Sequence, residues 1–384
     1  MTLKRSLLFS TFLLQIVPWS TSFAPKPVTV VNTRTGTCSG SYNLQLFSTT
    51  SLKEDQDFRI NTTPPQTQPA AAHTFAGQVE QALIAKYGQE DASRVLESWR
   101  LLDAEYEHRQ YVGGGEIDEA SSLNYQHAHS YVPGLTSKPF WDVETVPWAK
   151  KLAKEYKTIR KEFLDVTSNM EKLKAEGNNV WEGALTQEAG GYGEGWSTLV
   201  LMDRGIWEET NCNLFPKTAK SVKKSGIPAA EVFFASMKPN SSIKLHSDFT
   251  NFVLTSHLAV DIPENGNNKC RLSIGDETKE WINGEVMLFD TSIMHDAVNE
   301  SDQTRYILMF RVWHPDLTDA ERGALQMIYD YLEVPELLSS DETVRKGAEI
   351  MVEQMRAFPK LKVDTGGFGG GGKANNKKKK KGKR

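Results

Sequence analysis

The feature that most constrains the fold is a series of short apolar runs between Ala230 and Trp313, separated by turn sequences. The runs read EVFFASM, NFVLTSHLAVDI, CRLSIG, TKEWI, GEVMLFD and TRYILMFRVW, and the turns include ENGNN, GDE and NESDQ. Short runs rich in β-branched and aromatic residues, bounded by Gly, Asn and Asp, are typical of β-strands. Several such strands at roughly regular spacing predict a sandwich or jelly roll, so we expect a mainly β domain here.

Amphipathic helices are expected on both sides of this β region. Residues 74–107 and residues 152–163 carry apolar side chains at helical spacing. After the last strand, Thr318 and Glu321 have the spacing of a capping box, which predicts that a helix begins there. We therefore expect the β domain to be flanked by α-helices.

The patterns divide the chain into six segments. They are a signal peptide (1–22), a transit-like presequence and linker (23–72), a helical N-terminal region (73–182), a β domain (183–333), a C-terminal helix (334–365) and a disordered basic tail (366–384).

The N-terminus reads as a targeting sequence. Lys4 and Arg5 precede the apolar residues 7–17, a run of signal-peptide length that is too short to span a bilayer. Small residues follow before Phe23, and residues 26–53 contain no Asp or Glu. This arrangement resembles the two-part presequence of algae with complex plastids. We expect entry into the secretory pathway and delivery to a plastid, with the ER lumen or secretion as the alternative, and no transmembrane segment.

Charge is divided unevenly along the chain. The formal net charge is −4, but residues 366–384 contain eight basic residues and no acidic one, so residues 1–365 carry −12. An acidic body argues against nucleic acid as the main partner. The basic tail is expected to be a solubilising end, with contact to anionic surfaces as the alternative.

The sequence KLHSDFTN (244–251) contains the first candidate ligands. His246 and Asp248 are two residues apart and would point the same way on an extended segment. His295 follows a later strand and could lie on a neighbouring strand of a jelly roll. Two histidines and one carboxylate on one face hold iron in non-haem Fe(II) oxygenases and leave positions open. The same pattern also fits a polar turn, or a zinc site that activates water for hydrolysis.

Arg305 is a second candidate, because it begins an apolar run that reads as a central strand. A buried guanidinium is unfavourable unless an anion pairs with it. The anion could be a bound carboxylate or a structural partner such as Asp290, and spacing alone leaves both possibilities open.

Longer motifs resemble the aspartyl/asparaginyl β-hydroxylase family. They are FFASMKPNSSIKLHSDFTNFVLTSHLAVDIP, GEVMLFDTSIMHDAVNESDQTRYILMFRVWHPDLT, LTSKPFWD and LFPKTAK, within residues 131–322. The resemblance implies a double-stranded β-helix, a jelly roll of the cupin type, that uses Fe(II), 2-oxoglutarate and O₂. It implies that His246 and His295 bind iron, His257 and Arg305 bind 2-oxoglutarate, and Met237 lines its pocket.

Two departures from the family pattern concern the site. The animal protein-hydroxylating members have glycine where this chain has Asp248, so Asp248 would complete a three-ligand set, as in bacterial relatives that hydroxylate acyl chains. Thr255 replaces an arginine near 2-oxoglutarate, and Ala235 replaces a serine, so the co-substrate pocket is expected to differ. The resemblance therefore predicts a 2-oxoglutarate-dependent hydroxylase acting on a protein side chain, an acyl chain or a small metabolite. The alternatives are a zinc-dependent hydrolase and a non-catalytic cupin-like binding protein.

Overall fold

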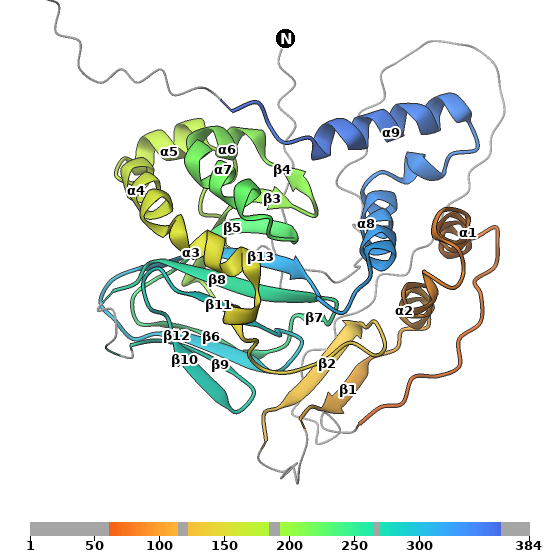
Figure 1. The fold of residues 1–384 in the computed structure, drawn as a ribbon, viewed down its shortest axis with the longest axis horizontal. Helices are drawn as coiled ribbons and strands as arrows, with labels where there is room; N and C mark the ends of the chain where they lie inside the picture. The colour runs from red at the N-terminus through yellow and green to blue at the C-terminus, as the bar shows by residue number, and fades with distance from the viewer. Residues whose placement is uncertain (1–60, 114–121, 184–192, 264–266, 268, 362–384) are drawn as a thin grey trace, which may run out of the picture.

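Two antiparallel β-sheets face each other at the centre of the protein (Figure 1). The structure is a computed structural model that describes residues 61–113, 122–183, 193–263, 267 and 269–361. The larger sheet has the order β11-β8-β13-β5-β3-β4, and the smaller one β10-β9-β12-β6.

Eight strands form a jelly roll, in which each successive strand lies in the other sheet except for the β9–β10 hairpin of the smaller sheet. They are β5 (Ala229–Met237), β6 (Ser241–His246), β8 (Val253–Asp261), β9 (Cys270–Ile274), β10 (Glu277–Glu280), β11 (Val286–Phe289), β12 (His295–Asn299) and β13 (Arg305–Trp313). Strands β3 (Trp196–Asp203) and β4 (Ile206–Trp207) extend the larger sheet beyond β5. The predicted fold class, a mainly β jelly roll with flanking helices, is confirmed.

Strand β13 is almost continuously apolar because both of its faces are buried. Successive side chains of a strand point to opposite faces. Ile307 and Met309 pack in the core between the two sheets, whereas Leu308 and Phe310 pack in the core on the outer face. Because both faces are covered, the strand lacks the polar alternation of a half-exposed strand.

Helices cover the outer face of the larger sheet (Figure 1). They are α3 (Pro147–Lys154), α4 (Tyr156–Thr167), α5 (Met170–Glu176), α6 (Glu209–Leu214) and α7 (Pro216–Ser225). The pattern over 152–163 predicted one helix, but the helix is broken at Glu155, which ends α3 and precedes α4. The Glu155 carboxylate accepts hydrogen bonds from Ser221 and Lys224 of α7, so the break faces another helix.

A second group of helices forms its own apolar core beside the sheets. The group comprises α1 (Phe75–Tyr87), α2 (Ser93–Asp103) and α8 (Asp319–Glu333). After α8 come η4 (Pro335–Leu338) and α9 (Glu342–Arg356), and α9 packs in a separate small cluster with Val334. The predicted capping box is confirmed, with Thr318 Oγ1 accepting from the Glu321 amide and the Glu321 carboxylate accepting from the Thr318 amide. Glu321 also pairs with Arg94 of α2 at 2.7 Å, which ties the start of α8 to the N-terminal helices.

The region 73–182 is not purely helical, as the sequence pattern had indicated. It also contains β1 (His108–Tyr111) and β2 (Tyr125–Ser130), which form a small sheet with β7 (Phe249–Thr250), and the short η2 (Val143–Thr145). Polar sequences such as HRQY and YQHAHS lack the apolar alternation that identifies a strand. Their burial comes from tertiary contacts, which the local pattern does not reveal.

Within the described residues, no helix is long and apolar enough to cross a membrane. The predicted signal peptide, residues 23–60 of the predicted presequence and linker, and the basic tail lie outside the described residues.

Candidate active site

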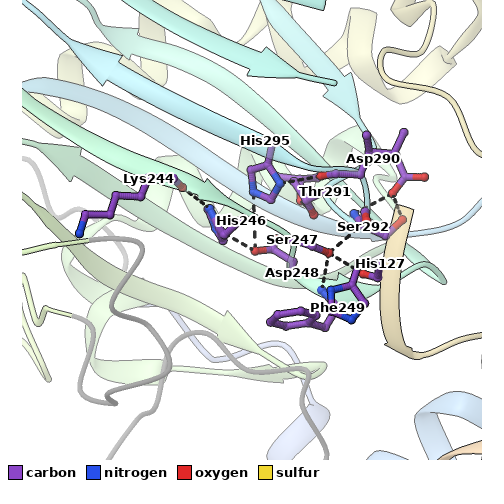
Figure 2. Close-up of polar contacts among 12 residues, drawn as sticks. His127, Lys244, His246, Ser247, Asp248, Phe249, Asp290, Thr291, Ser292 and His295 are labelled. Carbon is purple, nitrogen blue, oxygen red and sulfur yellow. Dashed lines mark hydrogen bonds and ion pairs between the residues drawn. The ribbon is translucent and has the colours of Figure 1, made fainter. Parts of the chain in front are cut away.

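His246, Asp248 and His295 converge at one end of the smaller sheet (Figure 2). His246 is the last residue of β6 and His295 the first residue of β12, and the two are paired directly across these strands. Asp248 Oδ1 lies 3.5 Å from His246 Nε2 and 3.8 Å from His295 Nε2. The predicted grouping of two imidazoles and one carboxylate is present in the structure.

Backbone carbonyl groups orient both imidazole rings. His246 Nδ1 lies 2.7 Å from the Lys244 carbonyl oxygen, and His295 Nδ1 lies 2.9 Å from that of Ile293. Because a carbonyl oxygen only accepts hydrogen bonds, each Nδ1 carries the proton and each Nε2 presents its lone pair toward Asp248. Burial, together with the neighbouring His246, lowers the pKa of His295 to about 3, so this ring is neutral at pH 7.

Arg311 of β13 holds the carboxylate of Asp248. Its Nη1 donates to Asp248 Oδ2, and the same group lies 3.0 Å from Thr255 Oγ1 and 2.9 Å from Thr291 Oγ1. Burial raises the pKa of Asp248, but Arg311 and the two histidines outweigh burial and hold the pKa well below its usual range. Asp248 is therefore an anion with Oδ2 bound to Arg311 and Oδ1 facing the imidazoles.

The sequence interpretation missed Arg311, although a signal was present. Arg311 is an even number of residues from Arg305 on the same predicted strand, so the two side chains share a face. A second guanidinium on the inner face of a buried strand needs an anion as much as the first one does.

A strained turn places Asp248. The next residue, Phe249, has φ +58°, a value that bulky side chains rarely adopt. Three hydrogen bonds fix the turn: the Asp248 amide donates to the Thr291 carbonyl at 2.8 Å, the Phe249 amide to Ser247 Oγ at 3.0 Å, and Ser247 Oγ to the His127 carbonyl at 2.6 Å. Such strain is retained where the surroundings over-determine the geometry, as they do here.

Arg305 is buried in the interior between the sheets without a carboxylate partner among the described residues. It is 1% exposed, its Nη2 lies 3.3 Å from Met237 Sδ, and its guanidinium carbon lies 4.2 Å from the centre of a Trp281 ring. Its Nε and Nη1 have no hydrogen-bond partner in the described structure. Burial lowers the pKa of Arg305 to about 10, so the group is still a cation at pH 7.

The alternative partner for Arg305, Asp290, bonds elsewhere. Its carboxylate accepts hydrogen bonds from Ser137 Oγ at 2.9 Å and from the Ser292 amide at 2.9 Å. The structural salt bridge between Asp290 and Arg305 is therefore not formed, and that alternative was wrong.

His257 of β8 adds a third buried donor to this interior. Trp281 Nε1 donates to His257 Nδ1 at 3.2 Å, and because an indole nitrogen only donates, the proton of the neutral ring resides on Nε2. Burial and then Arg305 hold the pKa of His257 well below its usual range, so the ring is neutral. His257 Nε2 is buried and has no hydrogen-bond partner among the described residues.

Of the other two predicted pocket residues, Met237 lies beside Arg305 and Thr255 does not. Met237 is paired with Arg305 across β5 and β13 and contacts the guanidinium through its sulfur. Thr255 instead bonds to Thr291 and Arg311, next to Asp248. The expected contact of Thr255 with a co-substrate stays a prediction, and the structure places this residue in the network that holds Asp248.

Comparison with known proteins connects this geometry to a family. The sequence profile described as aspartyl/asparaginyl beta-hydroxylase matches residues 153–315, which include the three candidate ligands and Arg305. Residues 153–315 belong to the aspartyl/asparaginyl β-hydroxylase family. The match begins in α3 and ends just after β13, so it spans the eight jelly-roll strands and the helices α4 to α7.

Two curated relatives illustrate the range of this hydroxylase family. The chain is 30% identical over 235 residues to the human aspartyl/asparaginyl beta-hydroxylase, covering 57% of this chain and 29% of the human protein. It is 28% identical over 203 residues to the ornithine lipid ester-linked acyl 2-hydroxylase of Rhizobium tropici, covering 49% of this chain and 63% of the bacterial one. The chain therefore spans less than a third of the human relative and under two thirds of the bacterial relative.

Among solved structures, the cupin domain of an XRE-family transcriptional regulator from Enterobacter cloacae is similar to part of this chain. It is 9% identical with a TM-score of 0.22, and the similarity covers 31% of this chain and 98% of that domain. At this TM-score the jelly-roll assignment depends on the strand order described above.

Proposed function

We propose that the protein is an Fe(II)- and 2-oxoglutarate-dependent hydroxylase. The main support is that the protein interior contains both the His246–Asp248–His295 group and buried hydrogen-bond donors without a partner among the described residues. Family membership of residues 153–315 supports the same activity.

The donor set fits Fe(II). Two imidazole nitrogens and one carboxylate oxygen are the ligands of non-haem Fe(II) oxygenases, and they leave coordination positions for other molecules. His246, Asp248 and His295 would hold the metal, while Arg311 fixes the carboxylate and the Lys244 and Ile293 carbonyls fix the rings. Bound Fe(II) would supply the chemistry of O₂ activation, in which 2-oxoglutarate, O₂ and R–H give succinate, CO₂ and R–OH.

The donors of Arg305 and His257 fit 2-oxoglutarate. Three buried donor nitrogens, Nε and Nη1 of Arg305 and Nε2 of His257, have no partner among the described residues, and leaving such donors unsatisfied is unfavourable. A dicarboxylate supplies acceptor oxygens and a negative charge that would pair with the guanidinium. A zinc hydrolase on the same ligands, or a binding protein without a co-substrate, would leave these donors without a purpose.

We propose that the substrate, whose C–H group is hydroxylated, is a protein side chain, an acyl chain or a small metabolite. The relatives' names cover the first two classes, an aspartyl or asparaginyl side chain and an ornithine lipid acyl chain. Asp248 and Thr255 depart from the animal pattern at the metal and next to it, which favours a substrate other than that of the animal enzyme.

The N-terminal sequence adds a proposal on location. Residues 1–53, with a basic start, an apolar run and an acid-poor stretch, would direct the protein into the secretory pathway and onward to a plastid. Fusing these residues to a fluorescent protein in an alga with complex plastids would test the proposal. Signal in the ER or in the medium instead would contradict plastid delivery.

The purified protein, supplied with Fe(II), 2-oxoglutarate and air, should form succinate even without substrate, because uncoupled turnover consumes the co-substrate slowly. Mass spectrometry should detect succinate that disappears when O₂ is excluded or when a chelator removes the metal. Zn²⁺ in place of Fe(II) should give none, since zinc has no redox chemistry. Hydrolase activity with Zn²⁺, and no succinate with Fe(II), would overturn the proposal.

A further inference from the structure

A second group of metal-ligating side chains lies beside the loop that carries Asp248, outside the candidate active site. His127 and His129 are two apart on β2, so their rings share one face of the strand. Glu107 immediately precedes β1, whose Arg109 pairs with His127 across the two strands. One ligand atom from each of Glu107, His127 and His129 lies within 4.8 Å of the others.

The distances fit one small cation. Glu107 Oε2 lies 3.3 Å from His127 Nε2, and Glu107 Oε1 lies 3.6 Å from His129 Nε2. Ligands about 2.0–2.2 Å from a tetrahedral Zn²⁺ lie about 3.3–3.6 Å from each other. The carboxylate of Glu107 has this spacing to each imidazole, through a different oxygen in each case, and the three ligand atoms all lie within 4.8 Å of one another. Imidazole nitrogen and carboxylate oxygen are ordinary ligands of Zn²⁺, and three protein ligands leave one position open.

One ring nitrogen of His129 is available to bind a metal ion. Its Nε2 is buried and has no hydrogen-bond partner among the described residues, and the nearest Glu107 oxygen lies beyond hydrogen-bond distance. Arg109 Nη2 lies 2.5 Å from Glu107 Oε2, so Arg109 fixes the carboxylate and leaves Oε1 for a cation. The Glu107 and His129 side chains are 39% and 30% exposed, which gives an ion a path from solvent.

The group is physically linked to the turn at Asp248. The Phe249 ring packs against both imidazoles, with ring centres 4.9 Å from His127 and 4.5 Å from His129. Strand β2 pairs with β7, which begins at Phe249, and the His127 carbonyl accepts from Ser247. Anything that fixes the two rings therefore also fixes the strained residue next to Asp248.

We propose that Glu107, His127 and His129 form a second divalent-metal site, suited to Zn²⁺, that braces β2 against the Asp248 turn. The two groups share no ligand, so the metal bound at each can be counted separately.

Metal stoichiometry of the full-length protein tests the proposal. After metal removal, dialysis against micromolar Zn²⁺ should leave two equivalents on the wild-type protein and on His73→Gln, a control at an exposed histidine. The double variants His246→Ala/His295→Ala and His127→Gln/His129→Gln should each retain one. Two equivalents on His127→Gln/His129→Gln, or none on His246→Ala/His295→Ala, would overturn the second site.

A stability measurement covers the case in which a double variant folds poorly. With Zn²⁺ at 100 times its dissociation constant, His246→Ala/His295→Ala should melt about 5 °C higher than without Zn²⁺. Adding Glu107→Gln to that variant should remove most of the increase. An increase that persists with Glu107→Gln would show that the zinc binds elsewhere.

Discussion

The Arg305→Met variant should need about 100-fold more 2-oxoglutarate than the wild-type protein for half-maximal succinate formation. Truncating one partner of a buried charge pair costs about 2–5 kcal/mol, and each 1.4 kcal/mol is a factor of ten in affinity. Met is apolar and of similar length, so the cavity keeps its shape while the cation is lost. At saturating 2-oxoglutarate, a substantial part of the wild-type rate should return, because the metal ligands are unchanged.

The same variant should be at least as stable to unfolding as the wild-type protein in the absence of 2-oxoglutarate. Arg305 is buried with unpaired donors, so its removal relieves a desolvation cost without breaking a described ion pair. The control Arg271→Met, which breaks a salt bridge with the exposed Glu300 at the surface, should change neither the 2-oxoglutarate requirement nor stability appreciably. A marked loss of stability in Arg305→Met with an unaltered 2-oxoglutarate requirement would show that Arg305 is structural.

The Arg311→Met variant should lose about 3–5 kcal/mol of unfolding free energy, because it leaves the Asp248 carboxylate buried without its cation. The double variant Arg311→Met/Asp248→Asn should recover much of that loss, since the charge at position 248 is then removed as well. Urea unfolding of the metal-free wild-type protein, Arg311→Met, Asp248→Asn and the double variant gives the four free energies of this cycle.

Arg271→Met again serves as the matched control, and its surface pair should contribute less than about 1 kcal/mol. If Arg311→Met and Arg271→Met were equally mild, Arg311 would not hold Asp248 in solution. If the double variant were no better than Arg311→Met, the loss would come from packing and not from the unpaired charge.

Much of the larger sheet could be predicted from sequence because strands such as β8 and β13 are buried on both faces. The run TRYILMFRVW is apolar along nearly its whole length, and the structure forms β13 over Arg305–Trp313. Strand β12, with the sequence HDAVN, escaped prediction because it is short and mixed in polarity. Its extended conformation is stabilised by pairing with β6 and β9, which the local sequence does not reveal.

Individual ligand residues of the site could be predicted from their residue type, whereas pairs formed between distant strands could not. His246, Asp248 and His295 stand out as ligand types at suitable positions, and the structure brings them together. The Arg311–Asp248 pair joins two strands far apart in the chain, and no local spacing connects its members. The second histidine group escaped for the same reason, since Glu107 and His127 meet only through the pairing of β1 with β2.

An anaerobic titration of Fe(II)-loaded protein with 2-oxoglutarate, followed by visible absorption, tests directly whether the co-substrate binds at the iron. If the co-substrate binds the metal held by His246, Asp248 and His295, a weak charge-transfer band should grow to saturation. His295→Ala should abolish the band, and Arg305→Met should require far more 2-oxoglutarate to reach it. A wild-type protein that binds Fe(II) but shows neither the band nor succinate formation in air would contradict the proposed 2-oxoglutarate-dependent activity.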